Sequence, residues 1–497
     1  MAQLALDGEG SLQRQLYRSL RAAILDGDPG PGRRLPATRV LAGDVGVSRN
    51  TVLQAYDQLL AEGYLTARGG SGTYVADTLP DERVAVGHLA AGGRGHDSAV
   101  PARAPRLSLA AQRMLDVVPR GLSWNLRPVP LPYDFRYGAP AFGDLPLETW
   151  WRIMGRRARH LSARRLSYSK PGGAPELRQA LAAYLRRARG VVCTPEQVIV
   201  VHGTQQAIDL TIRMVIDPGD RVVVEDPHYP GIALNAAAAG AELVGVPVDD
   251  EGLCVDRLDG ITPARLVCVT PSHQFPTGGV LPLARRLELL RFAEREDALI
   301  LEDDYDSEFR FDGRPIESLQ GLDQSGRVLY AGTASKLLFP SLRLGWLVVP
   351  QALRRPFLHA QALADTGSAT LEQLALADFI EDGHLERHVR RSRTRNGARR
   401  AALLDALATH FGERAVVSGT DAGLHVMLWL PELAAACVPA LCDEARGRGV
   451  GVYEVTTFYR EPPTQAALLL GYATLTEKEI RDGVARLADA YATLCKA

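Results

Sequence analysis

The stretch GTASKLLFPSLRLGW, residues 332–346, holds one lysine, Lys336, between two apolar runs, RVLYA and WLVV. A hydroxyl residue, Ser335, comes directly before the lysine, and Arg343 follows it within the same stretch. Most lysines are solvated surface charges, so a lysine between two buried-type runs needs another explanation. A lysine can form a Schiff base with an aldehyde cofactor, and this hypothesis predicts further features elsewhere in the chain.

Apolar strand candidates alternate with helix candidates from about residue 120 to the end of the chain. The strand-type runs include EQVIVV, DRVVVED, ARLVCVT and ALILEDDYD, and the helix-type runs include PGIALNAAAA and LPLARRLELLRFAERE. This order is typical of a mostly parallel sheet with helices on both faces. We therefore predict an α/β body over residues 119–497, with a small α+β subdomain over residues 350–497.

The strand ALILEDDYD carries side chains that pyridoxal 5'-phosphate requires. Asp303 stands at its carboxyl end, where a carboxylate can keep a pyridine nitrogen protonated, and Tyr305 can donate to the ring oxygen. The same acidic cluster is compatible with a solvated loop, whereas no glycine or bidentate glutamate follows at calcium-loop spacing. The six cysteines lack C-x-x-C pairs and neighbouring histidines at zinc-ligand spacing, so no metal site is predicted.

Other segments of the body supply the remaining parts of a pyridoxal phosphate site. VHGTQQAIDL places Thr204 and Gln205 at a helix start after a strand, where backbone amides and the helix dipole favour a phosphate. Tyr229, in EDPHYPG, is suited to stack on a ring, although a lone tyrosine more often belongs to a core. Three residues around the lysine can add phosphate contacts, namely Thr333, Ser335 and Arg343.

The amino-terminal part of the chain predicts three helices followed by a small β-hairpin. SLQRQLYRSLRAAILDG has apolar residues on a four-residue beat, and SRNTVLQAYDQLLAEG begins with Ser48 as a cap. In a helix-turn-helix, this third helix would enter the major groove with Arg49, Asn50 and Thr51 at its start, and Arg39 would contact phosphate. The glycine turn RGGSG would form a wing. The periodicity alone is equally compatible with a three-helix scaffold for protein contacts.

Between these two parts, residues 77–118 are rich in Gly, Ala, Pro and Arg and lack sustained periodicity. Such a composition is typical of a linker. We therefore expect a flexible linker over these residues.

The segment LPATRVLAGDVGVSRNTVLQAYDQLLAEGYLTARGGSGTYVA closely resembles the winged helix-turn-helix of gntR-type bacterial regulators. The matching pattern is LPS-x-R-x-LA, S-R-x-T-V, L-x-x-EGYL and G-x-GT-x-V, with Ala37 at the position of the serine. The resemblance implies a DNA-binding domain over residues 8–76 and a double-stranded DNA operator as its partner. By motif position, the implied DNA contacts are Arg39, Ser48, Arg49, Asn50, Thr51 and Gly70.

The body is similar to a fold-type I aminotransferase. GTQQAIDL, EDPHYPG, VTPSHQFPTGGVLP, LILEDDYDSEFRF and AGTASKLLFPSLRLGWLVVP match the MocR/GabR subfamily of GntR regulators. That family implies an aminotransferase-like body that binds pyridoxal phosphate through a Schiff base, here on Lys336, and senses a small molecule. It also implies a domain-swapped homodimer in which Tyr168 reaches the phosphate of the neighbouring subunit. The other implied cofactor contacts are Thr204, Gln205, Tyr229, Asp303, Tyr305, Thr333, Ser335 and Arg343.

The sequence departs from this family where a substrate would bind. Phe275 stands where aminotransferases carry an asparagine for the ring oxygen, which leaves His273 or Gln274 as alternatives. Leu469 stands where an arginine usually holds a substrate carboxylate, and Arg460 either replaces it from a loop or is solvated. The effector stays open among an amine, an amino acid, a sulfonate and pyridoxal phosphate itself.

Together the motifs predict a transcriptional regulator that depends on pyridoxal phosphate and is not an enzyme beyond residual half-transamination. An active aminotransferase with an ancillary DNA-binding domain is the alternative, and a cofactor-free repressor that uses its body only to dimerise is a third hypothesis. The formal net charge of −1 means that a DNA site must come from a local surface. No signal-type start or membrane-length apolar run is present, so we expect a cytoplasmic protein without a membrane partner.

Overall fold

The computed structural model describes residue 4 and residues 6–69, 71–80, 106–117, 131–311 and 316–495. The chain divides into two compact units, an amino-terminal unit (Met1–Arg106) and a body (Leu107–Ala497). None of the helices in the described ranges is both long and apolar enough to cross a bilayer.

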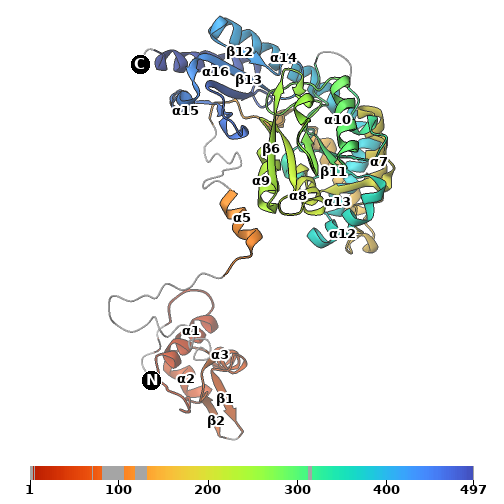
Figure 1. Cartoon of the computed structure of the whole chain (residues 1–497). Coiled ribbons are helices and arrows are strands. Elements are labelled where there is room, and N and C mark those ends of the chain that lie inside the picture. Colours follow the sequence, from red (N-terminus) through yellow and green to blue (C-terminus); the bar gives the residue numbers. More distant parts are fainter. Residues whose placement is uncertain are drawn as a thin grey trace. The chain divides into compact units, whose positions relative to one another are not determined.

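Three helices and a β-hairpin build the amino-terminal unit (Figure 1), as the sequence predicted. Apolar residues recur at every fourth position of the first helix, so Leu16, Leu20 and Ile24 lie on one face. These three side chains are buried in a hydrophobic core that belongs to the amino-terminal unit. Gly46, with a φ of 70°, ends the second helix and turns the chain toward Ser48, which caps the third. The elements are α1 (Leu12–Leu25), α2 (Thr38–Val45), α3 (Arg49–Ala61), β1 (Leu65–Arg68) and β2 (Gly72–Val75).

An eight-stranded sheet forms the centre of the body, in the order β4-β11-β10-β9-β8-β5-β6-β7. The run from β10 through β9, β8 and β5 to β6 is parallel, and only β11 and β7 oppose their neighbours, which confirms the predicted mostly parallel sheet. The strands are β4 (Val198–Val201), β5 (Arg221–Asp226), β6 (Glu242–Asp249), β7 (Gly252–Leu253), β8 (Leu266–Val269), β9 (Leu299–Asp304), β10 (Val328–Thr333) and β11 (Gly345–Val348).

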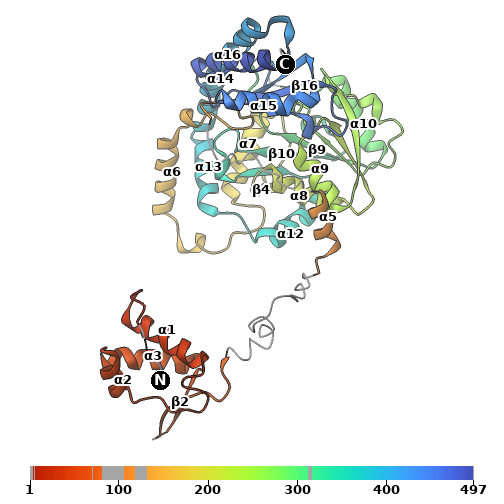
Figure 2. The same ribbon diagram turned by 90° about the vertical axis from the view of Figure 1, so that its left-hand side faces the viewer.

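Helices cover both faces of this sheet (Figure 2). Successive strand residues point to opposite faces, and here both sets of side chains are apolar and buried. In β4, Val198 and Val200 pack into the cluster that contains α7 and α13, whereas Ile199 and Val201 pack into the cluster that contains α8 and α12. The covering helices are α7 (Pro175–Arg189), α8 (Thr204–Val215), α9 (Pro230–Ala239), α10 (Leu283–Arg295), α12 (Arg354–Asp365) and α13 (Thr370–Glu381), and α6 (Leu147–Arg159) packs against α13. The short helix α11 (Leu319–Leu322) follows β9.

A second sheet, in the order β12-β13-β16-β15, forms the small subdomain with three helices. The boundary differs from the predicted residue 350, because α12 and α13 pack on the large sheet. The α13 helix buries residues around most of its circumference, including Leu374 and Phe379, and therefore needs partners on several sides. Conversely, Phe135, which precedes residue 350 in the chain, is buried in the hydrophobic core of the small subdomain. The elements are β3 (Tyr133–Asp134), α14 (His384–Phe411), β12 (Val416–Ser418), β13 (His425–Ala434), α15 (Val438–Gly447), β14 (Val450–Gly451), β15 (Tyr453–Glu454), β16 (Gln465–Gly471) and α16 (Glu477–Leu494).

A helix, α5 (Leu109–Val117), occupies part of the segment that the sequence assigned to a linker. Ser108 Oγ accepts a hydrogen bond from the amide of Ala111 at 3.1 Å, which caps the first turn. Arg113 Nε donates to the carbonyl of Ala238 in α9 at 3.2 Å, so the helix is anchored to the body. The composition of this segment, rich in Ala and Arg, did not predict such a short helix. Residues 81–105 and 118 of the predicted linker lie outside the described ranges.

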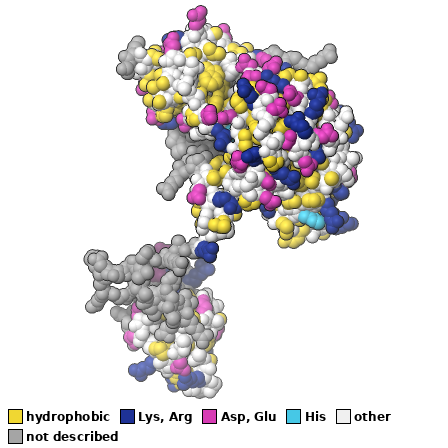
Figure 3. All heavy atoms as spheres, viewed as in Figure 1, with side chains coloured by type: hydrophobic (Ala, Val, Ile, Leu, Met, Phe, Trp, Pro, Cys, Tyr) yellow, Lys and Arg dark blue, Asp and Glu magenta, His cyan; other side chains and the backbone are white. Residues whose placement is uncertain are grey.

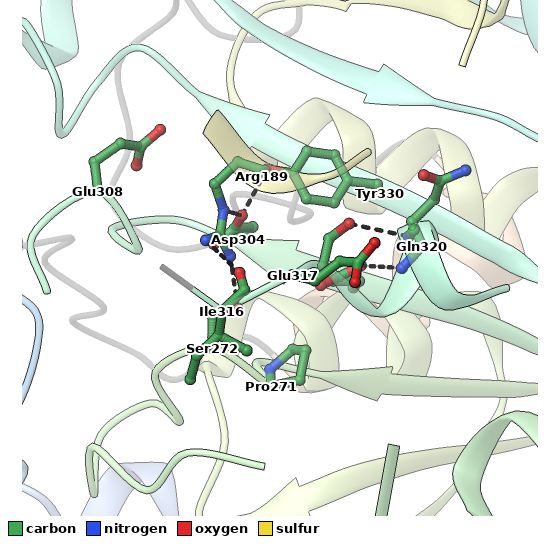
Figure 4. A network of polar contacts seen from close by, with 12 residues as sticks. Arg189, Pro271, Ser272, Asp304, Glu308, Ile316, Glu317, Gln320 and Tyr330 are labelled. Carbon is green, nitrogen blue, oxygen red and sulfur yellow. Dashed lines mark hydrogen bonds and ion pairs between the residues drawn. The ribbon is translucent and has the colours of Figure 1, made fainter. Parts of the chain in front are cut away.

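A buried ion pair between Arg189 and Asp304 lies at the carboxyl end of β9 (Figure 4). Arg189, the last residue of α7, donates from Nε to Asp304 Oδ2 at 2.7 Å and from Nη2 to Ser272 Oγ at 2.8 Å. The Tyr330 hydroxyl donates to the same Asp304 oxygen at 2.6 Å. The two charged side chains are only 3% and 2% exposed. The network ties α7, β9, β10 and the loop after β8 together at the edge of the sheet where Lys336 follows β10.

We expect Arg189→Gln to lower the free energy of unfolding of the body by about 3–5 kcal/mol, because Asp304 would be left charged, buried and unpaired. Arg187→Gln, on the same helix, is the control: its ion pair with Glu386 is 59% exposed at the arginine and should contribute only about 0–1 kcal/mol. Urea unfolding followed by near-ultraviolet circular dichroism measures both. Losses of the same small size in the two variants would contradict a structural role for the buried pair.

Candidate functional site

A cavity of about 870 Å³ opens in the body at the carboxyl ends of the central strands. Segments of the sheet line one side, and segments of the small subdomain line the other. Nine of the ten predicted cofactor contacts come together there, and the tenth, Tyr168, is 90% exposed and does not line the cavity. The nine are Thr204, Gln205, Tyr229, Asp303, Tyr305, Thr333, Ser335, Lys336 and Arg343.

Lys336 lines the cavity and donates from Nζ to the carbonyl of Gly138, another lining residue, at 2.5 Å. Gly138 has a φ of 73°, and a Cβ at this position would lie 3.0 Å from Nζ, so glycine leaves room for the amine. Burial lowers the pKa of Lys336, although the carboxylates of Asp306 and Asp303 oppose the shift. A larger fraction of this amine is therefore unprotonated at neutral pH than for an exposed lysine, and the unprotonated form is the nucleophile.

Asp303 faces the same cavity with a carboxylate that lacks a hydrogen-bond partner at Oδ1. Burial and the neighbouring Asp304 raise the pKa of Asp303 to about 8, against the opposing influence of Lys336. A buried carboxylate without a donor is costly, so this oxygen suits a ligand that carries a protonated nitrogen. Gln205 Oε1 is a second buried cavity oxygen without a partner.

An anion-binding corner lies at the start of α8. Gly203 precedes the helix with a φ of 92°, and a Cβ there would lie 3.5 Å from the Arg343 guanidinium, so the cation lies close to the free amides of the helix start. Arg343 itself has a φ of 51°, a conformation that non-glycine residues rarely adopt. Thr333 and Ser335 line the same cavity, and the hydroxyl of Thr333 accepts from the amide of Ser335 at 3.1 Å. Amides, hydroxyls and a guanidinium together are suited to a phosphate.

The Tyr305 hydroxyl lies 2.9 Å from Nδ1 of His273, which in turn lies 3.0 Å from an oxygen of Asp306. An N–H at Nδ1 that is shared between the carboxylate and the phenol oxygen leaves the phenol hydrogen free to point into the cavity. Burial raises the pKa of Tyr305 well above its ordinary value, so the phenol stays protonated. Of the two alternatives left by Phe275, His273 contacts the phenol, whereas the Gln274 amide donates to other buried oxygens.

Several cavity residues were missed by sequence reasoning. His228 directly precedes Tyr229 in the motif EDPHYPG, so its place in that motif could have predicted that it lines the cavity. Tyr137 and Glu454 line the cavity only because of the tertiary structure. Arg460 is exposed and donates from Nη1 to the carbonyl of Leu243 at 2.6 Å, so it does not replace the missing arginine in the cavity. Leu469 is fully buried in an apolar cluster of β16.

The start of α3 presents polar groups to solvent in the amino-terminal unit. Arg39, Arg49 and Asn50 are exposed, as base or phosphate contacts require. Ser48 Oγ accepts from the amide of Thr51 at 3.1 Å, so this hydroxyl also stabilises the helix start. Gly70, the remaining predicted DNA contact, lies outside the described residues. Figure 3 shows acidic and basic side chains interspersed on the visible face of the body, unlike a cationic surface for nucleic acid.

Comparison with known proteins agrees with both units. Residues 135–487 match the family described as aminotransferase class I and II, and residues 12–75 match the bacterial regulatory proteins of the gntR family. The probable rhizopine catabolism regulatory protein MocR of Rhizobium meliloti is 42% identical over 99% of this chain and 96% of its own length. The regulator TauR of Rhodobacter capsulatus is 35% identical over 98% of each chain.

Among solved structures, the α-aminoadipate aminotransferase LysN of Thermus thermophilus, complexed with N-(5'-phosphopyridoxyl)-L-leucine, is similar to the body. It superimposes with a TM-score of 0.67 at 27% identity and covers 78% of this chain and 96% of its own. The fold of the body is thus that of an aminotransferase, and the full-length similarity is to regulators. The chain belongs to the MocR type of gntR-family transcriptional regulators, in which a helix-turn-helix unit is joined to an aminotransferase class I and II body.

Proposed function

We propose that this regulator binds pyridoxal 5'-phosphate in the cavity of its body and that occupancy of the cavity changes its binding to an operator. The observation that carries the proposal is the convergence of an amine, an unpartnered carboxylate and an anion-binding corner on one cavity. When bound, pyridoxal phosphate supplies an aldehyde carbon that can join Lys336 Nζ with loss of water.

The cavity residues named above have distinct roles in this scheme. Asp303 accepts from the protonated ring nitrogen, and Tyr305 donates to the ring oxygen from a phenol held by His273. Tyr229 lies along the cavity, where its ring can stack on the cofactor. The phosphate is held by the start of α8 together with Thr204, Gln205, Thr333, Ser335 and Arg343.

Regulation would follow from a second molecule that alters the occupied cavity. The candidates are an amine, an amino acid, a sulfonate and pyridoxal phosphate itself, and an amine would take over the bond that Lys336 makes. Exchange of one such bond for another changes little free energy, so contacts made on closure must supply a coupling of a few kcal/mol. We further propose a cytoplasmic, domain-swapped homodimer in which the exposed Tyr168 of one subunit reaches the phosphate of the other.

An active aminotransferase is the second candidate, and the nearly complete set of cofactor contacts favours it. Leu469, buried at the position of a substrate arginine, argues against it. We therefore propose that the body senses ligands and is not an enzyme beyond half-transamination. Sustained turnover with an amino donor and an oxo acid would establish the alternative.

We expect Lys336→Ala to abolish covalent attachment of pyridoxal phosphate, because the variant lacks the amine that bonds to the aldehyde carbon. Borohydride trapping followed by peptide mapping of the protein measures the attachment. Lys478→Ala, at the exposed start of α16, is the matched control and should retain full labelling of position 336. Labelling of the Lys336→Ala variant to the same extent as the control would exclude this lysine.

We expect Asp303→Asn to weaken cofactor binding and, near pH 8, to stabilise the cofactor-free protein. The pKa of Asp303 rises from an ordinary 3.8 to about 8 on folding, so folding favours the protonated carboxyl. That stabilisation is complete below pH 3.8 and is lost as the pH rises to about 8. Melting temperatures of cofactor-free protein between pH 5 and pH 9 should therefore fall less steeply for the variant. A parallel pH dependence in the two proteins would contradict the burial of an unpaired carboxylate.

We expect Arg49→Ala to weaken binding to DNA from upstream of the protein's own gene by about 1–3 kcal/mol if the residue reads a base. A phosphate contact would instead reduce the salt dependence of binding to any sequence. Fluorescence anisotropy at several salt concentrations separates these results. Gln58→Ala, near the other end of α3, is the control, and an equal effect in both variants would argue for damage to the fold.

A further inference from the structure

The positive charges along the cavity already have partners or roles. Among the described residues that line it, the lysine and arginine side chains are Lys336, Arg343 and Arg446. Under the proposed function, Lys336 bonds to the cofactor and Arg343 holds its phosphate. Arg446, at the rim, forms an ion pair with Asp443 one turn away on α15. Apart from this exposed arginine, whose charge Asp443 offsets, no further guanidinium or ammonium group in the described lining of one chain remains for an acidic group on the effector.

The two cavity histidines do not supply a cation either. Burial lowers the pKa of His228. Burial and the neighbouring His273 lower the pKa of His425 well below its ordinary value. Both rings are therefore neutral near pH 7. Nδ1 of His228 has no hydrogen-bond partner, although the residue is only 6% exposed, so this ring can exchange a hydrogen bond with a neutral group of a ligand.

The wall between these groups is apolar and aromatic. A cluster built on Phe275, Phe458 and Leu469 carries tyrosine rings on its cavity side. Phe275 and Phe458 pack edge to face at 5.0 Å between ring centroids, so the wall is closely packed. A carboxylate placed against this surface would lose its hydration without gaining a cation, which is strongly unfavourable.

The rim adds charge of the opposite kind. Glu454 of β15 lines the cavity, and its carboxylate accepts from the Thr456 hydroxyl at 3.2 Å. Asp443 also lines it, beside Arg446. Two carboxylates and one guanidinium leave the rim with a net charge of about −1, which attracts cations and repels anions.

We propose that the effector is a primary amine that carries no carboxylate or sulfonate and whose body is apolar or aromatic. The inference rests on the proposed function, because the amine would replace Lys336 on the bound cofactor. In that exchange the ligand's nitrogen bonds to the cofactor carbon as the bond to Nζ breaks. Two hydrogens pass from the ligand's nitrogen to Nζ, and no oxidant or reductant is needed. The class excludes ordinary amino acids as effectors.

Matched pairs of ligands test the proposal on full-length protein that has been loaded with pyridoxal phosphate and freed of excess cofactor. The pairs are phenethylamine with phenylalanine, tyramine with tyrosine, and propylamine with taurine. Absorbance of the bound cofactor and binding to upstream DNA are measured together. We expect the amine of each pair to act at a concentration at least about tenfold lower than its acidic partner. An equal or stronger response to the acidic partners overturns the inference.

The loading step separates this outcome from failure of the proposed function. Protein that shows no cofactor band and no borohydride-trapped Lys336 contradicts the proposed function before any amine is added. Protein that loads normally but prefers phenylalanine, tyrosine or taurine leaves the cofactor site intact and contradicts only the effector class. Loaded protein that responds to neither member of any pair also contradicts the inference.

A substitution at the exposed cavity residue Thr457 tests the charge argument directly. Thr457→Arg adds a cation on the small-subdomain side and should narrow the difference between phenethylamine and phenylalanine by about tenfold. Thr457→Gln adds a side chain without charge and should leave the difference in place. If Thr457→Arg still loads the cofactor but keeps the original difference between phenethylamine and phenylalanine, charge does not set the preference for the amine.

Discussion

Two adjacent buried carboxylates at the end of β9 set the main electrostatic constraint of the body. Because neighbouring strand residues point to opposite faces, Asp304 meets Arg189 while Asp303 faces the cavity. The first carboxylate is neutralised by the fold itself, through an ion pair that also holds Ser272 and Tyr330. The second has no such partner within the chain. Asp304 therefore contributes to the stability of the fold, whereas Asp303 faces the cavity, where we propose that it meets the protonated ring of the cofactor.

Most of the residues that sequence reasoning brought to the cavity share one property: they lie at or just after the carboxyl ends of parallel strands. Parallel strands end at the same edge, so Thr204, Tyr229, Asp303 and Lys336 could be placed together without knowledge of packing. Tyr137 and Glu454 line the same cavity, but the local sequence pattern around them does not predict this position. Tertiary contacts alone bring them there.

The errors at domain boundaries have a similar origin. The α5 helix is short, and its contact with α9 is what gives it a place on the body. The α12 and α13 helices follow the last strand of the large sheet, so a boundary at residue 350 was reasonable from the chain order. Packing overrides that order, because the apolar surface of α13 needs burial on several sides. Sequence periodicity shows that a helix has an apolar surface but does not show against which hydrophobic core the helix packs.

The cavity has walls from two different parts of the fold, and this arrangement has a consequence for how such regulators diverge. The strand ends supply the groups that suit the cofactor, whereas Val452, Glu454, Thr457 and Phe458 come from the small subdomain. Substitutions in the second set can change which ligand fits while the first set is untouched. A change of ligand specificity in this wall therefore does not require any change in the groups that we propose hold the cofactor.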